Sequence, residues 1–291
     1  HETDMSFSVS IDNGLFEYGG SNLRSLFAQK TNFFKKDFWI MLIEIVKFYH
    51  KAEIDKSKYN DLTINDYLTK MKYSSFFIKN HLLPMAASIW SAPTDEIKQF
   101  PFPNFVEFFK NHGLLNLINR PKWRTVENGS REYVKKIISE SRFKIKISER
   151  VKSVVRENKE IKIISESHEE MFDHVIFACH SDQSLKILDK PTQHEKLNLL
   201  KIRYKKNIVW LHSDEEFMPK RKSVWSSWNY MNNNDHKTNS LSVTYWMNNL
   251  QNLKTREDIF VSLNPIKEPK KEKVYKKLIY SHPLFDANTI S

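Results

Sequence analysis

The sequence predicts a mixed α/β protein, and three observations support this fold class. Polar and apolar residues alternate over residues 5–18, as they do in a strand pair. From residue 21 to about residue 117, apolar residues recur at helical spacing. Beyond residue 143, short alternating or continuous apolar runs typical of strands return among helical segments. The pattern thus predicts a helix-rich block, a compact α/β block and a strand-rich block, in that order.

The first block opens with a predicted β-hairpin. Its strands lie within residues 5–18, and the turn Asp12-Asn13-Gly14 supplies residues that tolerate positive φ. Helices are then predicted from residue 21, where Ser21-Asn22-Leu23-Arg24 opens the first, over 36–53, from residue 63 and over 74–90, with Thr63 as a polar start. The prolines at 93, 101 and 103 predict a turn, and Gly113 ends a short helix over 104–111.

The middle block begins with a strand-like pair at residues 125–126, followed by the small-residue turn Asn128-Gly129-Ser130 and a helix over 131–139. Paired strands are predicted over 144–155 and 160–165. The run 173–178 (DHVIFA) is continuously apolar between polar residues, which predicts a strand covered on both faces. In the last block, strands are predicted over 201–212, 223–230 and 241–246, and a helix over 255–263.

The composition is that of an ordinary globular protein of 291 residues, with 40% hydrophobic and 28% charged residues. Its net charge of +11 is spread along the chain in lysine doublets and forms no block of five or six like charges. A solvated basic surface is therefore favoured over specific nucleic-acid binding. A non-catalytic basic module that binds nucleic acid or an anionic membrane surface stands as the alternative function.

Several classes of protein are disfavoured by what the sequence lacks. One cysteine, Cys179, excludes an internal disulfide. The richest apolar run, 38–49, is interrupted by Glu44 and Lys47, so no transmembrane segment is predicted. The absence of a signal-peptide pattern favours a cytoplasmic protein, with peripheral membrane contact as an alternative.

Motifs by themselves identify no chemistry in this sequence. There is no glycine-rich phosphate loop, nucleophile elbow, zinc-binding helix or paired-cysteine motif. Cys179 and His180 are neighbours, which would point to opposite faces of a strand and could not pair. The histidines at 168, 174, 180 and 194 lack metal-ligand spacing, so no metal site is expected. Core packing is favoured over a substrate pocket for the aromatic group Trp225, Trp228 and Tyr230.

Several stretches, however, are together similar to one family. They are DMSFSVS at 4–10, EYGGSNL at 17–23, FFKNHGLL at 108–115, PKWRTVENGSREYV at 121–134, DHVIFACHSDQSLKIL at 173–188, segments of 202–230 ending in WSSWNY, VSLNP at 261–265 and YSHPLFD at 280–286. In this order they resemble the FAD-dependent oxidoreductases of the flavin-containing amine oxidase superfamily. More narrowly, they resemble a bacterial branch described as predicted NAD/FAD-binding proteins.

The resemblance implies an interleaved architecture, in which a partial Rossmann-like FAD-binding domain alternates with a helix-plus-sheet substrate domain. Residues 1–117 would form the first substrate-domain segment and 118–190 the central FAD-domain segment. Residues 191–280 would form the second substrate-domain segment, and 281–291 would begin the return to the FAD domain. The family's two glycine-rich FAD motifs would then lie before His1 and after Ser291, which makes this chain an internal fragment and explains why it has only five glycines.

The resemblance also implies site residues. Val151 would meet the adenine of FAD through its main chain. Gly129, Ser130 and Arg131 would belong to a turn near the cofactor, with Asn128 in place of the family's usual glycine, and Ala178 would end a strand that passes near the dinucleotide. On the substrate side, the expected residues are Trp225, Trp228, Asn229 and Tyr230.

The implied function is flavin redox chemistry on a small molecule. Many amine oxidases place a lysine near the flavin on the strand that corresponds to 208–211, where this chain reads IVWL. That difference favours an apolar, lipid-like substrate over an amine. The resemblance thus predicts an FAD-dependent oxidoreductase, present as a fragment that is inactive by itself.

Overall fold

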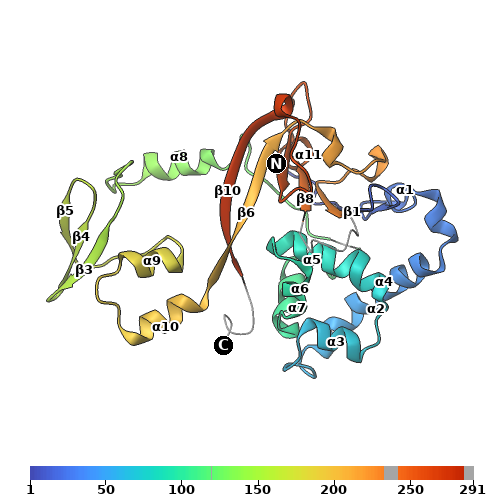
Figure 1. Ribbon diagram of the computed structural model, residues 1–291, viewed down its shortest axis with the longest axis horizontal. Coiled ribbons are helices and arrows are strands. Elements are labelled where there is room, and N and C mark those ends of the chain that lie inside the picture. Colours follow the sequence, from blue (N-terminus) through green and yellow to red (C-terminus); the bar gives the residue numbers. More distant parts are fainter. Residues whose placement is uncertain (119, 233–241, 285–291) are drawn as a thin grey trace. The chain divides into compact units, whose positions relative to one another are not determined.

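A computed structural model describes residues 1–118, 120–232 and 242–284 (Figure 1). The chain divides into two compact units, each taken by itself below. The larger unit contains His1–Val134 and Lys206–His282, and the smaller contains Lys135–Lys205 and the residues from Pro283 onward. The larger unit is therefore assembled from two segments that are far apart in the sequence.

A seven-stranded mixed sheet organises the larger unit. In spatial order its strands are β10 (Val274–Leu284), β6 (Arg203–His212), β9 (Phe260–Leu263), β8 (Ser242–Trp246), β7 (Trp228–Asn232), β1 (Phe7–Ile11) and β2 (Phe16–Gly19). The pairing of β1 with β7 is parallel and joins the two chain segments. The described pairings of β2, β8 and β9 with their neighbours are antiparallel. The predicted hairpin is present as β1 and β2, and Asp12, Asn13 and Gly14 all have positive φ in its turn.

Helices follow the hairpin as predicted, and several have identifiable caps. They are α1 (Leu23–Leu26), η1 (Lys30–Phe34), α2 (Lys36–Asp55), α3 (Ile64–Lys70), α4 (Ser75–Phe77), η2 (Ile78–Leu82), α5 (Leu83–Trp90), α6 (Thr94–Lys98) and α7 (Phe102–Asn111). The side chains of Asn22, Thr63 and Ser74 accept a backbone N–H at the starts of α1, α3 and α4. α6 forms where only a turn is predicted.

The helices cover one face of the sheet. Tyr18 on β2 has its ring 6.0 Å from that of Phe38 on α2, and Phe16 contacts the same phenylalanine from 6.2 Å. Val9, Tyr230 and Val243 lie on this face and are buried. Aromatic rings fill much of the space between the helices themselves, as where Phe48 packs against Tyr67 and Phe105.

Among the described residues, four short helical elements lie in the connections between the later strands of the sheet. They are η3 (Glu215–Phe217), η4 (Lys222–Val224), α11 (Met247–Gln251) and η5 (Lys271–Lys273). η4 occupies part of the predicted strand 223–230, so that strand begins only at Trp228.

The smaller unit contains a three-stranded antiparallel sheet and two helices. Its strands are β3 (Ser153–Glu157), β4 (Glu160–Ile164) and β5 (Glu169–Phe172), and its helices are α9 (Ser181–Ile187) and α10 (Gln193–Lys201). α8 (Arg131–Glu140) leads into this unit. The strand pair β3–β4 and helix α8 agree with the sequence expectation, although residues 144–152 are not part of a strand.

Two predicted elements are wrong. Residues 173–178 form no strand, because among the described residues no neighbouring strand pairs with them. Of their apolar side chains, Ile176 and Ala178 are exposed and Val175 and Phe177 are half-buried. Residues 255–263 are not a helix, because 260–263 form strand β9, paired with β6 on one side and β8 on the other. The predicted domain boundaries, at 117/118 and 190/191, differ from the unit boundaries at 134/135 and 205/206 and stay predictions.

Glu17 on β2 links the sheet to the segment that contains Lys220 and Arg221. Its fully buried carboxylate accepts hydrogen bonds from Ser10 Oγ at 2.8 Å, from the Lys220 N–H at 2.7 Å and from Arg221 Nη1 at 2.7 Å. Truncation leaves these donors without an acceptor. We expect Glu17→Ala to lower the free energy of unfolding by about 3 kcal/mol, measured by urea denaturation. Glu127→Ala, at an exposed carboxylate, is the control and should change it by less than about 0.5 kcal/mol; equal effects would contradict this role.

Candidate functional site

Strand β7 carries three of the four residues predicted for the substrate side, and its register divides them between two faces. Trp228 lies opposite Phe7 and Tyr245, whereas Asn229 lies opposite Ser8 and Thr244. Because side chains alternate along a strand, Trp228 and Tyr230 share the helix-covered face and Asn229 points to the other. The structure therefore brings together Trp228 and Tyr230, but not Asn229.

Asn229 belongs to a buried polar layer. Its Oδ1 accepts hydrogen bonds from Ser8 Oγ at 2.7 Å and from the Ser226 N–H at 2.9 Å. Its Nδ2 donates to the carbonyl oxygens of Ser226 at 2.6 Å and Thr244 at 3.0 Å. Both amide hydrogens and the amide oxygen are thus engaged within the protein. These bonds hold the 226–229 bend against β1 and β8.

The same polar layer continues to His212 on β6. His212 Nε2 lies 2.8 Å from Ser262 Oγ, which lies 2.7 Å from Thr244 Oγ1. The Asp214 N–H donates to His212 Nδ1 at 3.1 Å, so the neutral ring carries its proton on Nε2. Burial lowers the pKa of His212 to about 4, against a smaller opposing effect of the Asp214 charge. Sequence reasoning missed this residue; its position in the alternating run 203–212, inside a predicted strand, is the signal that could have found it.

Trp228 and Trp225 differ in how their indole N–H groups are used. Trp225 Nε1 donates to the Pro219 carbonyl oxygen at 2.7 Å, and its ring lies 5.5 Å from that of Trp246. Trp228 packs edge-on against Tyr245 at 5.0 Å, and its buried Nε1–H has no hydrogen-bond partner in the described part of the chain. Burial raises the pKa of Tyr230 to about 12, so its hydroxyl stays protonated. Trp228 is thus the member of the predicted group with a donor still available.

A second buried histidine, also missed from the sequence, lies beneath the helix-covered face. His81 is in η2, a π-helical turn, and its Nδ1 lies 2.8 Å from Tyr18 Oη and its Nε2 3.2 Å from Tyr49 Oη. Tyr18 Oη also donates to the Asn80 carbonyl oxygen at 3.0 Å. Burial lowers the pKa of His81 to about 3, and the nearby Arg120 charge acts in the same direction. This chain of bonds fixes η2 against the sheet.

The predicted cofactor-side turn 128–131 has the backbone conformation expected of it. Asn128 has a φ of 61° and Gly129 a φ of 91°, so both occupy the left-handed region. The space where a Cβ of Gly129 would lie is open, with no heavy atom within 4 Å. Ser130 and Arg131 follow at the start of α8 and are exposed. The turn is therefore formed and accessible.

Val151 lies in the smaller unit, just before β3. Among the described residues, its main-chain N–H and C=O have no hydrogen-bond partner, whereas the next N–H, of Lys152, donates to the Ile164 carbonyl oxygen at 2.8 Å. Val151 therefore has one donor and one acceptor on its main chain that no described residue engages.

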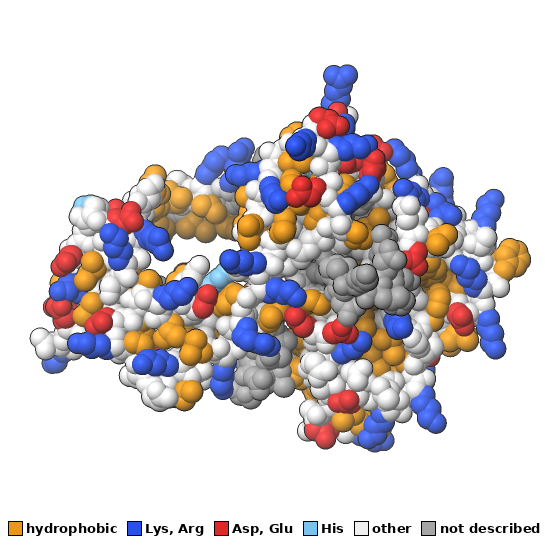
Figure 2. All heavy atoms as spheres, viewed as in Figure 1, with side chains coloured by type: hydrophobic (Ala, Val, Ile, Leu, Met, Phe, Trp, Pro, Cys, Tyr) orange, Lys and Arg blue, Asp and Glu red, His pale blue; other side chains and the backbone are white. Residues whose placement is uncertain are grey.

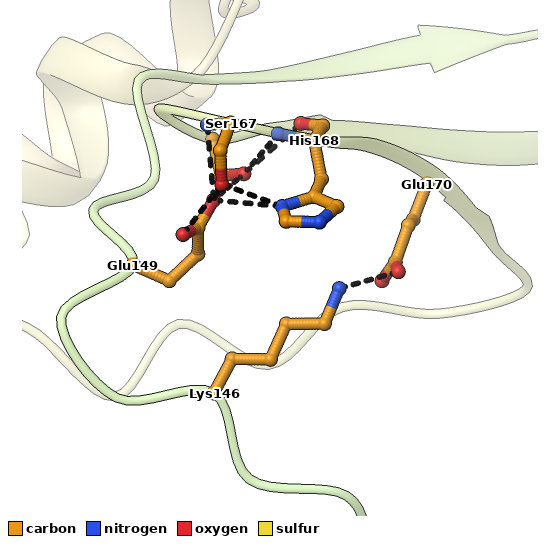
Figure 3. A network of polar contacts seen from close by, with 6 residues as sticks. Lys146, Glu149, Ser167, His168 and Glu170 are labelled. Atoms are coloured by element: carbon orange, nitrogen blue, oxygen red, sulfur yellow. Dashed lines mark hydrogen bonds and ion pairs between the residues drawn. The ribbon is translucent and has the colours of Figure 1, made fainter.

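Glu149, two residues before Val151 in the sequence, forms a network of polar contacts with Ser167 and His168 (Figure 3). Its carboxylate accepts hydrogen bonds from Ser165 Oγ, from the Ser167 N–H at 3.1 Å and from Ser167 Oγ at 2.7 Å. These bonds lower the pKa of Glu149 to about 2. Although Ser167, His168 and Glu149 are the residue types of a hydrolytic triad, Ser167 Oγ and Glu149 Oε1 both approach the same nitrogen, Nδ1, at 2.6 and 3.3 Å. They cannot relay a proton through the ring, so the network is a structural clamp.

The predicted Ala178 lies in an exposed extended segment. Two residues later, the His180 ring stacks on Tyr204 with centroids 4.2 Å apart, and the Ser181 N–H donates to Tyr204 Oη at 3.0 Å. Cys179 Sγ lies 3.3 Å from Ser184 Oγ and not beside an imidazole. Leu188, after α9, forms a parallel bridge to Val154. The structure thus brings the segment after Ala178 against the strand after Val151.

Apolar burial in the smaller unit is slight. Among its described residues, Val154 and Leu188 are the buried apolar side chains. Ile176 is 91% exposed and Ile147 is 84% exposed, and α8 and α10 have no buried residue. Exposed apolar side chains also line α8 and the stretch after it: Tyr133, Val134, Ile137, Ile138, Phe143 and Ile145. Such a surface is characteristic of one that another part of a protein covers.

The remaining candidate sites in the described part of the chain contain none of the predicted site residues. An open hollow of about 600 Å³ in the larger unit is lined by Leu211, Arg256, Glu257 and Tyr275, among others, and by none of the predicted site residues. Within the described ranges, no group of three or more histidine, cysteine or acidic residues could hold a metal ion. None of the helices there has the combined length and hydrophobicity that crossing a bilayer requires.

Comparison with known proteins gives a fold but no close relative. No protein-family model and no curated protein sequence matches this chain. Among solved structures, a protein from Exiguobacterium sp. 255-15 assigned as a protoporphyrinogen oxidase matches with a TM-score of 0.58 at 12% identity, over 98% of this chain and 70% of that one. A CLA-producing fatty acid isomerase from P. acnes matches with a TM-score of 0.58 at 11% identity, over 97% and 69%.

A putrescine oxidase variant redesigned in cofactor binding matches with a TM-score of 0.57 at 11% identity, over 94% of this chain and 62% of that one. A cyclohexylamine oxidase from Brevibacterium oxydans IH-35A is also among the matches. The chain therefore shares the fold of these oxidase and isomerase structures, which confirms the predicted α/β fold class. It spans about two thirds of the length of these structures.

The buried neutral His212 makes stability depend on pH. Its pKa in the folded protein, about 4, lies below the ordinary value of 6.5, so the unfolded chain binds the proton first as pH falls. We expect the free energy of unfolding to decrease from pH 6.5 toward pH 4 by about 1.4 kcal/mol per pH unit from this residue. Urea unfolding of His212→Gln should show a shallower pH dependence over this range than the wild type, and the exposed His50→Gln should not. Identical slopes for all three would contradict the assignment.

Proposed function

We propose that this chain is the central part of an FAD-dependent oxidoreductase that acts on a small apolar molecule. The observation that carries the proposal is the extent of the fold match. It includes 98% of this chain but only 70% of the solved structure. The whole fold present here is thus found inside a larger enzyme fold, and the proposal extends the enzyme class of those structures to this protein.

The exposed apolar surface of the smaller unit supports this reading. A strand such as the predicted 173–178 is stable only when neighbouring strands pair with it and helices cover it. In the described residues it has neither, and α8 has an uncovered apolar stripe that includes Val134, Ile137 and Ile138. A further stretch of an FAD-binding domain, carrying the glycine-rich phosphate motif, would supply both partners.

The chain's own residues fit the adenine end of FAD and not its phosphates. The N–H and C=O of Val151 are free to pair with a purine edge, and Glu149 holds their backbone in place. Within the smaller unit, the exposed segment at Ala178 would lie along the dinucleotide. The pyrophosphate needs several backbone N–H groups at a glycine-rich turn before a helix, and this sequence has no such motif. When bound, FAD accepts or gives a hydride, and the protein positions the substrate and excludes water.

On the substrate side, the contacts would come from Trp228 and Tyr230. Both lie on the same face of β7, and Trp228 keeps a free indole N–H. Asn229 and Trp225 would support this strand through their hydrogen bonds rather than touch the substrate. An apolar, lipid-like molecule is favoured over an amine because residues 208–211 include no lysine.

The first test is the cofactor itself. The protein is purified in the longest form that its gene encodes, incubated with FAD, desalted and examined by absorption spectroscopy. We expect the two visible flavin bands, at about one flavin per protein. Residues 1–291 alone should retain almost none, because they contribute no pyrophosphate site. A longer form without flavin would refute the proposal. Stoichiometric FAD on residues 1–291 would refute the inference that the pyrophosphate contacts lie outside these residues.

A second test removes the N–H of Val151. Val151→Pro deletes the one donor proposed for the adenine, whereas Val151→Ala keeps the main chain and shortens the side chain. We expect Val151→Pro to weaken FAD binding to the longest encoded form about tenfold, the worth of one hydrogen bond. Titration of the apoprotein by quenching of flavin fluorescence measures this, and Val151→Ala should stay within about twofold. Equal affinities for the two variants would exclude the main-chain contact.

A further inference from the structure

An aromatic cluster protrudes from the larger unit where η1 meets α2. The rings of Phe27, Phe33, Phe34 and Trp39 contact one another in sequence, with centroids 5.5 to 5.9 Å apart. Trp39 Nε1 donates to the Phe33 carbonyl oxygen at 2.8 Å, which fixes the bend. Unlike core aromatics, Phe34 is 85% exposed and Phe33 is 54% exposed. The cluster is therefore ordered by its own contacts and yet faces solvent.

Exposed aliphatic side chains extend this surface on both sides. Leu23 on α1 is 75% exposed, and Ile43 on α2 is 65% exposed and lies one helical turn beyond Trp39. We call these residues, with the aromatic cluster, the α1–α2 apex. Figure 2 shows hydrophobic side chains interleaved with lysine and arginine side chains over this part of the larger unit, at the right of the view. A contiguous exposed apolar patch of this kind marks an interaction site.

The charges of the apex are mainly positive, because four exposed cations and one exposed carboxylate, Asp37, lie between Leu23 and Ile43. Residues 21–36 contain Arg24, Lys30, Lys35 and Lys36, all exposed, and no acidic residue. The first acidic side chain beyond them is Asp37, and Glu44 farther along α2 is buried and accepts hydrogen bonds from Ser74. The apex thus combines projecting apolar groups with a surrounding set of cations.

We propose that the α1–α2 apex docks onto an anionic lipid surface. Tryptophan and phenylalanine placed beside lysine and arginine are the side chains that favour the membrane–water interface, where rings enter the headgroup region and cations meet lipid phosphates. Juxtaposed basic side chains strengthen such binding through the negative surface potential. The surface would hold the protein at the source of an apolar substrate, but the proposal does not depend on FAD or on catalysis.

The shape and charge of the apex disfavour other occupants. A second copy of this chain would add another molecule of net charge +11 against four cations, which opposes self-association. A protein groove requires a matching shape, whereas Phe34 and Leu23 are 85% and 75% exposed and are not among the residues that line the hollow in the larger unit. A lipid headgroup region accepts such projecting groups without a preformed shape.

Vesicle binding tests the proposal. The purified protein is sedimented with vesicles of phosphatidylcholine, with and without phosphatidylserine, at low and at physiological salt. We expect binding that requires phosphatidylserine and weakens with salt, since the charges are exposed. Phe33→Ser/Phe34→Ser should bind at least tenfold more weakly, since two projecting rings are lost. Lys35→Gln/Lys36→Gln should bind about 30-fold more weakly at low salt, about fivefold for each charge removed.

Matched controls separate the apex from the overall charge. Lys159→Gln/Lys190→Gln removes two exposed lysines from the smaller unit and should change vesicle affinity by less than about threefold. Circular dichroism confirms that each variant is folded. No binding of the wild type to phosphatidylserine vesicles, or equal loss in the apex and control lysine variants, would overturn the proposal. So would a concentration-dependent dimer, seen by analytical ultracentrifugation, that the Phe33→Ser/Phe34→Ser change abolishes.

Discussion

The parallel pairing of β1 with β7 is the constraint on which the larger unit depends. It joins residues 7–11 to residues 228–232, so the first segment of the chain and a segment beyond the smaller unit share one sheet. The Trp228 N–H donates to the Ser6 carbonyl oxygen, and the Ser227 N–H donates to Ser6 Oγ, which extends the junction beyond the ladder. The sheet needs strands from both segments of the larger unit, which are residues 1–134 and 206–282. Residues 135–205 are therefore an insertion between these two segments.

The two faces of this sheet are stabilised in different ways. One is apolar and packs on aromatic rings of the helices. The other buries a hydrogen-bonded layer that runs from Ser8 through Asn229 and Thr244 to His212. A buried polar group stabilises a fold only when it is satisfied, and here the engaged groups come from strands distant in sequence. The layer therefore specifies the strand order. The indole Nε1–H of Trp228, which has no hydrogen-bond partner in the described part of the chain, is by contrast a group suited to an external partner.

The smaller unit is held together mainly by local polar and stacking contacts, and not by a buried apolar core. The Glu149 network and the stacking of His180 on Tyr204 hold its segments locally, but few apolar side chains are buried. Local polar clamps order a backbone, whereas burial supplies most of the favourable free energy of a fold. This contrast is the physical support for the proposal that residues 173–178 and α8 belong to an FAD-binding domain.

Local signals in the sequence determined the hairpin, the capped helix starts, the strand pair β3–β4 and the strands β6 and β8, whereas β5 and β10 were not predicted. The polar caps at Asn22 and Thr63 act within one turn, and the alternation of 203–212 reflects a single strand, so neither needs tertiary information. Only the tertiary structure decided that 260–263 is a strand, that 173–178 is not, and that Asn229 is consumed by internal hydrogen bonds. Each of these outcomes depends on residues that are distant in the sequence. A strand forms only when a neighbouring strand pairs with it. A buried polar side chain is available to a ligand only when no other part of the chain forms hydrogen bonds with it.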